Sequence, residues 1–146
     1  MKHLPLYFVL FCMALATSLV FTAQANAQTS KLLIHITGFE SSEGVAKVGV
    51  FNSKKGYEDD VRFKGFNFNI IDNKVEQTIE LPYGEYAIKV YHDENSNDEL
   101  DTMLFGIPSE DYGFSNNARG SMGPPEYEQV VFKLDSAQKE ITINVQ

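Results

Sequence analysis

The sequence predicts an all-β protein, an antiparallel β-sandwich of about seven strands with one long ordered loop. In several short segments the apolar residues alternate with polar ones, which is typical of half-buried strands. Turn-forming Pro, Gly, Asp and Asn separate these segments. Beyond the N-terminal apolar run, no segment shows helical spacing over more than a turn or two. Runs of short strands without long helices favour a sandwich.

The N-terminal 27 residues have the layout of a secretory signal peptide. A basic start precedes an almost wholly apolar run from Leu4 to Phe21, and Ala25 and Ala27 supply a cleavage pattern before Gln28. A retained membrane anchor is the alternative, because the run approaches the roughly 20 residues that a spanning helix needs. We expect cleavage, because no basic stop-transfer flank follows. The sequence thus predicts residues 1–27 as signal peptide and 28–146 as one exported domain, periplasmic or extracellular.

The composition limits the partners of this domain. Its only cysteine, Cys12, lies in the predicted signal peptide, so we expect no disulfide. The chain has 20 acidic residues, 12 Lys and Arg, and a formal net charge of −8. This balance disfavours nucleic acid and anionic membrane surfaces, and it favours cations or simple solubility. We expect a monomer with no nucleic-acid partner and no membrane insertion after cleavage.

The strands follow one another along the chain with short connections. In the first strand Leu32, Ile34 and Ile36 share one face, and a connection over residues 52–66 leaves room for one helical turn. Turns are expected at residues 72–73 and 82–84, and a hairpin at 135–138. The predicted strands cover residues 31–37, 45–52, 66–71, 75–81, 84–92, 128–134 and 140–145.

The long loop over residues 92–127 begins with a spacing typical of calcium loops. Side-chain oxygens recur at relative positions 1, 3, 5 and 9, and position 7 lends its carbonyl. Two departures weaken the motif, because Asp98 replaces the usual Gly and Leu104 replaces the bidentate Glu. We expect at most a weak Ca²⁺ site, roughly 10⁻⁴ to 10⁻³ M; the alternative is an Asx-rich turn bonded to itself. The candidate ligands are Asp93, Asn95, Asn97, Glu99 and Asp101.

The second part of the loop, residues 106–125, is rich in turn formers but carries its own apolar side chains, so we expect it to be ordered. It presents a mixed aromatic, amide and guanidinium group that can hold a polar ligand such as a sugar or peptide. Alternatively, the asparagines hold loop backbone and Arg119 pairs with Glu110 or Asp111. The candidate ligand-binding residues are Tyr112, Phe114, Asn116, Asn117 and Arg119.

No recognisable catalytic set is present, and we expect that the protein is not an enzyme. A hydrolase that uses Ser115 with His92, or loop carboxylates such as Glu110 and Asp111, is one alternative. We expect His92 instead on a buried face, holding loop backbone. The favoured interpretation is an exported binding or accessory module that contacts a polar ligand or an envelope partner. A purely structural envelope protein is the other alternative.

The segments HDEN, LD, GIP, YGFSNNA and the Gly-Pro-Pro stretch together resemble a family of small exported bacterial proteins, the domain of unknown function 2141. The resemblance covers nearly all of residues 28–146. It implies a signal peptide and a transthyretin- or immunoglobulin-like β-sandwich, with no established activity. The family pattern has Gly at the position of Asp98, so the tight turn of the family differs here.

Overall fold

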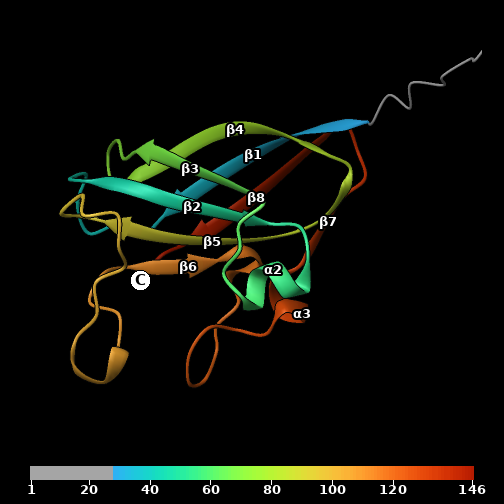
Figure 1. Ribbon diagram of the computed structural model, residues 1–146. Helices are drawn as coiled ribbons and strands as arrows, with labels where there is room; N and C mark the ends of the chain where they lie inside the picture. Colours follow the sequence, from blue (N-terminus) through green and yellow to red (C-terminus); the bar gives the residue numbers. More distant parts are fainter. Residues whose placement is uncertain (1–27) are drawn as a thin grey trace, which may run out of the picture.

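The computed structural model describes residues 28–146, which form two β-sheets packed face to face (Figure 1). The predicted signal peptide and its cleavage site before Gln28 involve residues 1–27, which lie outside the described residues. Over the described range the chain has eight strands and only short helices. None of those helices is long and apolar enough to cross a membrane. The predicted all-β sandwich is therefore confirmed.

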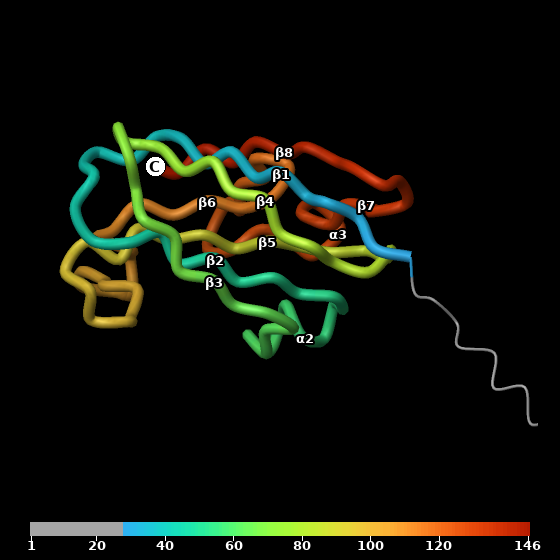
Figure 2. The backbone as a smooth tube through the Cα atoms, turned by 90° about the horizontal axis from the view of Figure 1, so that it is seen from above, coloured from blue at the N-terminus to red at the C-terminus, as the bar shows by residue number. Residues whose placement is uncertain are grey.

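The first sheet has β1 (Thr29–Thr37) at its centre, between β4 (Lys74–Pro82) and β8 (Gln138–Asn144). β1 runs antiparallel to β4 but parallel to β8. The chain therefore enters at one end of the sandwich and leaves at the other, as Figure 2 shows. This parallel pair differs from the purely antiparallel arrangement that the sequence predicts.

The second sheet has the order β3 (Lys64–Asn69), β2 (Val45–Phe51), β5 (Gly84–Asp93) and β6 (Tyr112–Phe114). The free edge of β5 is shared, because β6 pairs with its second half and β7 (Phe132–Leu134) with its first residues. All of these pairs are antiparallel. β5 is thus the strand that holds the long loop against the sandwich.

The main core lies between the two sheets and is built from the alternating residues of the strands. Leu32, Ile34 and Ile36 of β1 are fully buried, as their alternation predicts. They pack against the inward side chains of the facing sheet, because successive residues of a strand point to opposite faces. The buried residues that face one another from β2 and β5 are Ala46, Val48, Val50, Tyr86, Ile88 and Val90.

A second, smaller core lies on the outer face of the second sheet. Two short helices cover it, α2 (Lys54–Glu58) and α3 (Tyr127–Val130), which lie next to each other in Figure 1. α2 begins where the Ser53 side chain accepts a hydrogen bond from the amide of Gly56. The buried residues of this cluster are Phe51, Tyr57, Ala87, Phe114 and Val130. Both faces of β5 are therefore buried over much of its length.

Two local predictions are wrong. The expected strand over 128–134 is split, because Glu126 and Gln129 form a reciprocal capping box that starts α3 and leaves only β7 as strand. Residues 135–138 form no hairpin, because β7 pairs with β5 in one sheet and β8 with β1 in the other. The long loop, which the sequence predicts to be ordered, contains a strand, β6, and two short 3-10 turns, η1 (Leu104–Gly106) and η2 (Ser115–Asn117).

Candidate functional site

The loop of residues 93–101, called the Asx loop below, folds back on its own side chains. The carboxylate of Asp93 accepts hydrogen bonds from the amides of Asn97, at 3.0 Å, and Asp98, at 3.1 Å. The side-chain amides of Asn95 and Asn97 donate to the carboxylate of Asp101, at 2.6 and 3.1 Å. Asp98 adopts the left-handed backbone that its position requires, with φ of 68°. The contacts observed in this loop are those of the Asx-turn alternative.

Lys47 supplies a positive charge to this loop from the neighbouring strand β2. Its ammonium lies 3.6 Å from Oδ2 of Asp93 and also contacts the carboxylate of Asp98. Asp93 is fully buried and Lys47 is 8% exposed, so the pair is shielded from water. The hydrogen bond to Asp98 is the main cause that raises the pKa of Lys47, and the charges of Asp98 and Asp93 add to it.

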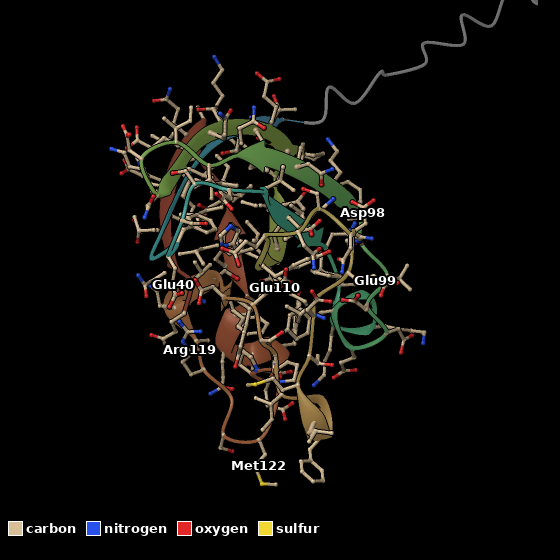
Figure 3. The ribbon with its side chains drawn as sticks, turned by 90° about the vertical axis from the view of Figure 1, so that its left-hand side faces the viewer. Glu40, Asp98, Glu99, Glu110, Arg119 and Met122 are labelled. Carbon is tan, nitrogen blue, oxygen red and sulfur yellow. The ribbon has the colours of Figure 1, made fainter. Side chains whose placement is uncertain are left out.

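Glu110 ties the Asx loop to the second part of the long loop. One oxygen of its carboxylate accepts from the amide of Glu94 and the other from the amide of Asp101, both at 3.0 Å. Figure 3 shows Glu110 in the middle of this end of the molecule. Both oxygens are thus used to fix main chain, which is the local reason that the Asx loop keeps its shape.

The five predicted calcium ligands lie together in the Asx loop, but their side chains face different partners. Asn95 and Asn97 turn toward Asp101, whereas Asp93 is directed to backbone amides and Lys47. Glu99 donates its amide to the side chain of Asn97. Within residues 28–146 no group of three or more His, Cys, Asp or Glu side chains is arranged so that it could hold a metal ion.

A groove of about 350 Å³ lies on the outer face of the second sheet, beside the Asx loop. Strands β2, β5 and β6 form its floor, Asp60 and Arg62 stand on one side, and residues 98–100 stand on the other. Figure 3 shows Asp98 and Glu99 at this edge. Gly49, also on the floor, has no side chain, and this lets Arg62 approach the strand: a Cβ at Gly49 would lie only 3.1 Å from Cδ of Arg62. The floor residues are Lys47, Gly49, Phe51, Lys89, Tyr91, Tyr112 and Phe114.

Charged groups in the groove are mostly paired with one another. The ammonium of Lys89 donates to Asp60, at 2.8 Å, and to the carbonyl of Tyr57, at 2.9 Å. It also lies over the rings of Tyr57 and Phe51, at 4.4 and 4.8 Å from their centroids. Arg62, in contrast, takes part in no ion pair among the described residues. The groove therefore offers fixed donors and acceptors and one cation with no carboxylate partner.

Tyrosines give the groove an aromatic lining. Tyr91 donates its hydroxyl to the carbonyl of Asp98 at 3.0 Å, which leaves its ring on the floor. Burial is the main cause that raises the pKa of Tyr91, and the charge of Asp93 adds to it. Tyr112 packs edge-on against Phe114 with ring centroids 5.9 Å apart. The phenol of Tyr91 therefore stays protonated at neutral pH and provides a neutral polar surface.

Of the five predicted ligand-binding residues, the structure brings two into this groove. Tyr112 and Phe114 line it from β6. Asn116 instead donates to the carbonyls of Gln129 and Val131, both at 3.0 Å, and so fastens η2 to α3.

The remaining two residues of that set, Asn117 and Arg119, contact the end of β8. The side-chain oxygen of Asn117 accepts from the amide of Asn144 at 2.7 Å. Arg119 donates to the carbonyls of Tyr112, at 3.1 Å, and Asn144, at 2.9 Å. The expected alternative pairing of Arg119 with Glu110 or Asp111 does not occur. These contacts close the long loop over the edge of the sandwich.

Ser115 and His92, the residues of the hydrolase alternative, each contact main chain. Ser115 is fully buried; its hydroxyl accepts from the amide of Ile88 at 2.9 Å and donates to the carbonyl of Val130 at 2.6 Å. His92 is buried and its Nε2 lies 2.7 Å from the carbonyl oxygen of Glu43. The prediction that His92 is buried and holds loop backbone is confirmed.

Sequence reasoning missed the groove and its cationic residues, Lys47, Arg62 and Lys89. The alternation of β5 already places Lys89 and Tyr91 on the outer face of the sheet. The alternation does not predict that residues of the α2–β3 connection and of the Asx loop border that face and line the groove. The one signal in the sequence is Gly49, a glycine inside a strand, which often marks a close approach of another group.

The fold and the groove define a small β-sandwich domain whose long loop builds one wall of a surface site. The sequence from residue 34 to 142 matches the family model described as "Uncharacterized protein conserved in bacteria (DUF2141)". The chain belongs to this family, and the resemblance noted from the sequence is confirmed. No curated protein and no solved structure matched the chain.

Proposed function

We propose that this protein is an exported binding module, and that its ligand site is the groove on the outer face of β2, β5 and β6. The observation that supports the proposal is the groove itself, which has a volume of about 350 Å³ and a floor that combines aromatic rings with fixed polar groups. Its size and mixed lining are typical of sites for small polar ligands. The proposed place of action is the periplasm or the outside of the cell, in contact with an envelope component.

The ligand is a polar molecule with both donors and acceptors, about one or two sugar rings or a few peptide units in size. The Lys89–Asp60 and Lys47–Asp98 pairs place an ammonium beside a carboxylate, so each pair offers a donor and an acceptor side by side. Tyr91 and Tyr112 offer ring faces for stacking. Arg62 adds a guanidinium that forms no ion pair in the described part of the chain.

Variants on the groove floor test this proposal. Gly49→Ala places a Cβ 3.1 Å from Cδ of Arg62 and 3.2 Å from the Phe51 ring, so it displaces the flexible Arg62 side chain from its position over the floor. Arg62→Gln removes the unpaired cation. Both variants should fold normally and lose retention on a cell-envelope fraction, by about tenfold, as expected for a lost charged hydrogen bond. Lys31→Gln, at an exposed cation on β1 of the other sheet and outside the groove, is the matched control for the loss of charge. Equal retention of all variants contradicts the proposal.

The calcium expectation is retained as a proposal in a reduced form. Lys47 already neutralises the buried Asp93, so Asp101 is the one acidic side chain of the set that faces the amides of Asn95 and Asn97. Those amides would have to turn their oxygens inward for an ion to bind. We propose a weak site at these three residues. Millimolar calcium should then raise the melting temperature of the wild type and leave that of Asp101→Asn unchanged; a flat titration of the wild type refutes it.

Binding is proposed in preference to hydrolysis because of the contacts of Ser115 and His92. The Ser115 hydroxyl is fully buried and bonded to two main-chain groups on β5 and α3. His92 lies four residues farther along β5 and faces the carbonyl of Glu43. A nucleophile needs a base within hydrogen-bond reach, and both residues are used instead to hold main chain.

A further inference from the structure

Two loop tips at one end of the molecule expose large apolar side chains to solvent. Phe105 is 99% exposed, Leu104 82% and Met122 100%. Met103 and Ile107 are more than half exposed as well. Monomeric soluble proteins rarely present such side chains together, and where they do the surface is usually a site of interaction. We call residues 103–107 and Met122 the apolar tips.

Both tips are built as closed turns. Around the first tip, Met103 donates to the carbonyl of Ile107 at 2.7 Å, and Thr102 and Pro108 form a β-bridge. Phe105 and Gly106 both have positive φ, 69° and 74°, and the first of these is uncommon for a bulky residue. The turn thus directs Phe105 outward at a conformational cost.

The second tip closes by a tight approach of its own backbone. A Cβ on Gly120 would collide with the carbonyl of Gly123, so the chain between them forms a narrow turn with Met122 at its end. Figure 1 shows this loop and the η1 loop extending from the same side of the sandwich, and Figure 3, turned by 90°, shows the same arrangement with Met122 at the extremity. The two tips therefore present their side chains in one direction.

The tips also differ from the rest of the chain in charge. Residues 102–109 and 118–125 contain no Asp or Glu, although the chain has 20 of them, and their only charged residue is Arg119. The acidic residues of the long loop begin directly behind the first tip, at Asp101 and Glu110. Uncharged apolar protrusions backed by polar side chains suit the boundary between the headgroups and acyl chains of a bilayer.

We propose that the apolar tips dock the protein on the surface of a zwitterionic lipid bilayer, with Leu104, Phe105 and Met122 in the interface. The tips are convex and separate, and a bilayer accepts such protrusions without a matching cleft. The acidic residues behind them repel an anionic surface, so neutral headgroups are the better partner. This contact requires no spanning segment, and it is independent of the ligand groove.

Sedimentation with lipid vesicles tests the proposal on the protein recovered after export, with its N-terminus determined by mass spectrometry. The wild type should bind phosphatidylcholine vesicles, and at low salt added phosphatidylglycerol should weaken binding. Added salt should remove that difference, because it screens the repulsion. Leu104→Ser, Phe105→Ser and Met122→Ser should each lower the partition coefficient, by about tenfold for a large apolar side chain.

Ile71→Ser is the matched control, because Ile71 is 66% exposed in the β3–β4 turn, away from the tips. It should bind vesicles as the wild type does. Phe105→Trp adds a direct reading: the chain has no Trp, so a blue shift of the new fluorescence on vesicle addition reports entry of this tip. Thermal melts should show that every variant is folded.

Three results overturn the proposal. They are a wild type that ignores phosphatidylcholine vesicles, an Ile71→Ser variant that loses binding as the tip variants do, and self-association in sedimentation velocity that the tip variants abolish. The last result assigns the tips to a contact between copies of the chain. Loss of envelope retention in the groove variants with intact vesicle binding separates this proposal from the proposed ligand site.

Discussion

Lys47 on β2 and Asp93 at the end of β5 form a shielded ion pair across two neighbouring strands, with 3.6 Å between the ammonium nitrogen and Oδ2. The carboxylate also accepts hydrogen bonds from two amides of the Asx loop, whereas its partner Lys47 lines the groove floor. The pair thus links the conformation of the loop to the shape of the groove.

Removal of the ammonium should therefore be costly. Lys47→Met leaves Asp93 buried without its counter-charge and should lower the free energy of unfolding by about 3 kcal/mol. The double variant Lys47→Met, Asp93→Asn should recover part of the loss, because it removes the buried charge. Lys133→Met, which breaks only an exposed pair with Asp135, should change stability little. Urea denaturation measures all of these, and equal effects of the two lysine variants contradict the interpretation.

The buried hydroxyl of Ser115 provides a second prediction. Ser115→Ala leaves the amide of Ile88 and the carbonyl of Val130 without their partner, and should cost about 1 to 3 kcal/mol of stability. Ser121→Ala, at an exposed position, is the control. A Ser115→Ala protein that is as stable as the wild type would show that these hydrogen bonds contribute nothing, and it would reopen the hydrolase alternative.

Glu110 should control local rather than global order. Glu110→Ala frees the amides of Glu94 and Asp101, so their hydrogen exchange should accelerate while the core strands keep their protection. Glu110→Gln keeps one acceptor and should give an intermediate effect. Glu99→Gln, which alters an exposed side chain of the same loop, is the control. Uniform acceleration across the whole domain would argue against a local role.

The protein should lose stability in alkali through Tyr57. Burial, with smaller contributions from Glu126 and Asp60, raises the pKa of Tyr57 from 10.0 to about 12. Below pH 10 the phenol is protonated in both the folded and the unfolded chain, so its full contribution to the free energy of unfolding is present. This contribution is lost as the pH rises toward 12, because the phenol of the unfolded chain loses its proton at a lower pH than the buried phenol, which favours the unfolded chain. Tyr57→Phe should flatten the stability curve over this window in chemical denaturation, although it also removes the hydrogen bond to Pro125.

The alternation of apolar residues was sufficient to predict the sandwich and most strand positions, because a period of two is a local property. It does not specify strand partners, so neither the parallel pairing of β8 with β1 nor the sharing of the β5 edge was predictable. The Asx loop was found by its spacing. Lys47 was not associated with it, because the two residues of that ion pair are 46 positions apart and meet only through the pairing of β2 with β5.

One signal was present and overlooked. Glu126 followed by Gln129 after two prolines is the pattern of a helix start, and it forms the capping box that replaces strand by α3. The groove, in contrast, depends on two connections that happen to flank the same sheet face. The positions of these two connections over the sheet follow from tertiary packing, and no local sequence pattern predicts them.

The parallel pairing of β1 with β8 also sets the timing of folding. The first described strand occupies the middle of its sheet, and one of its two neighbours is the last described strand. A chain that emerges from the ribosome or from a translocation pore with its N-terminus first therefore lacks this neighbour until residues 138–144 are free. The first sheet cannot be completed before that point, and a loss of residues 138–146 would expose a long edge of β1 to other chains.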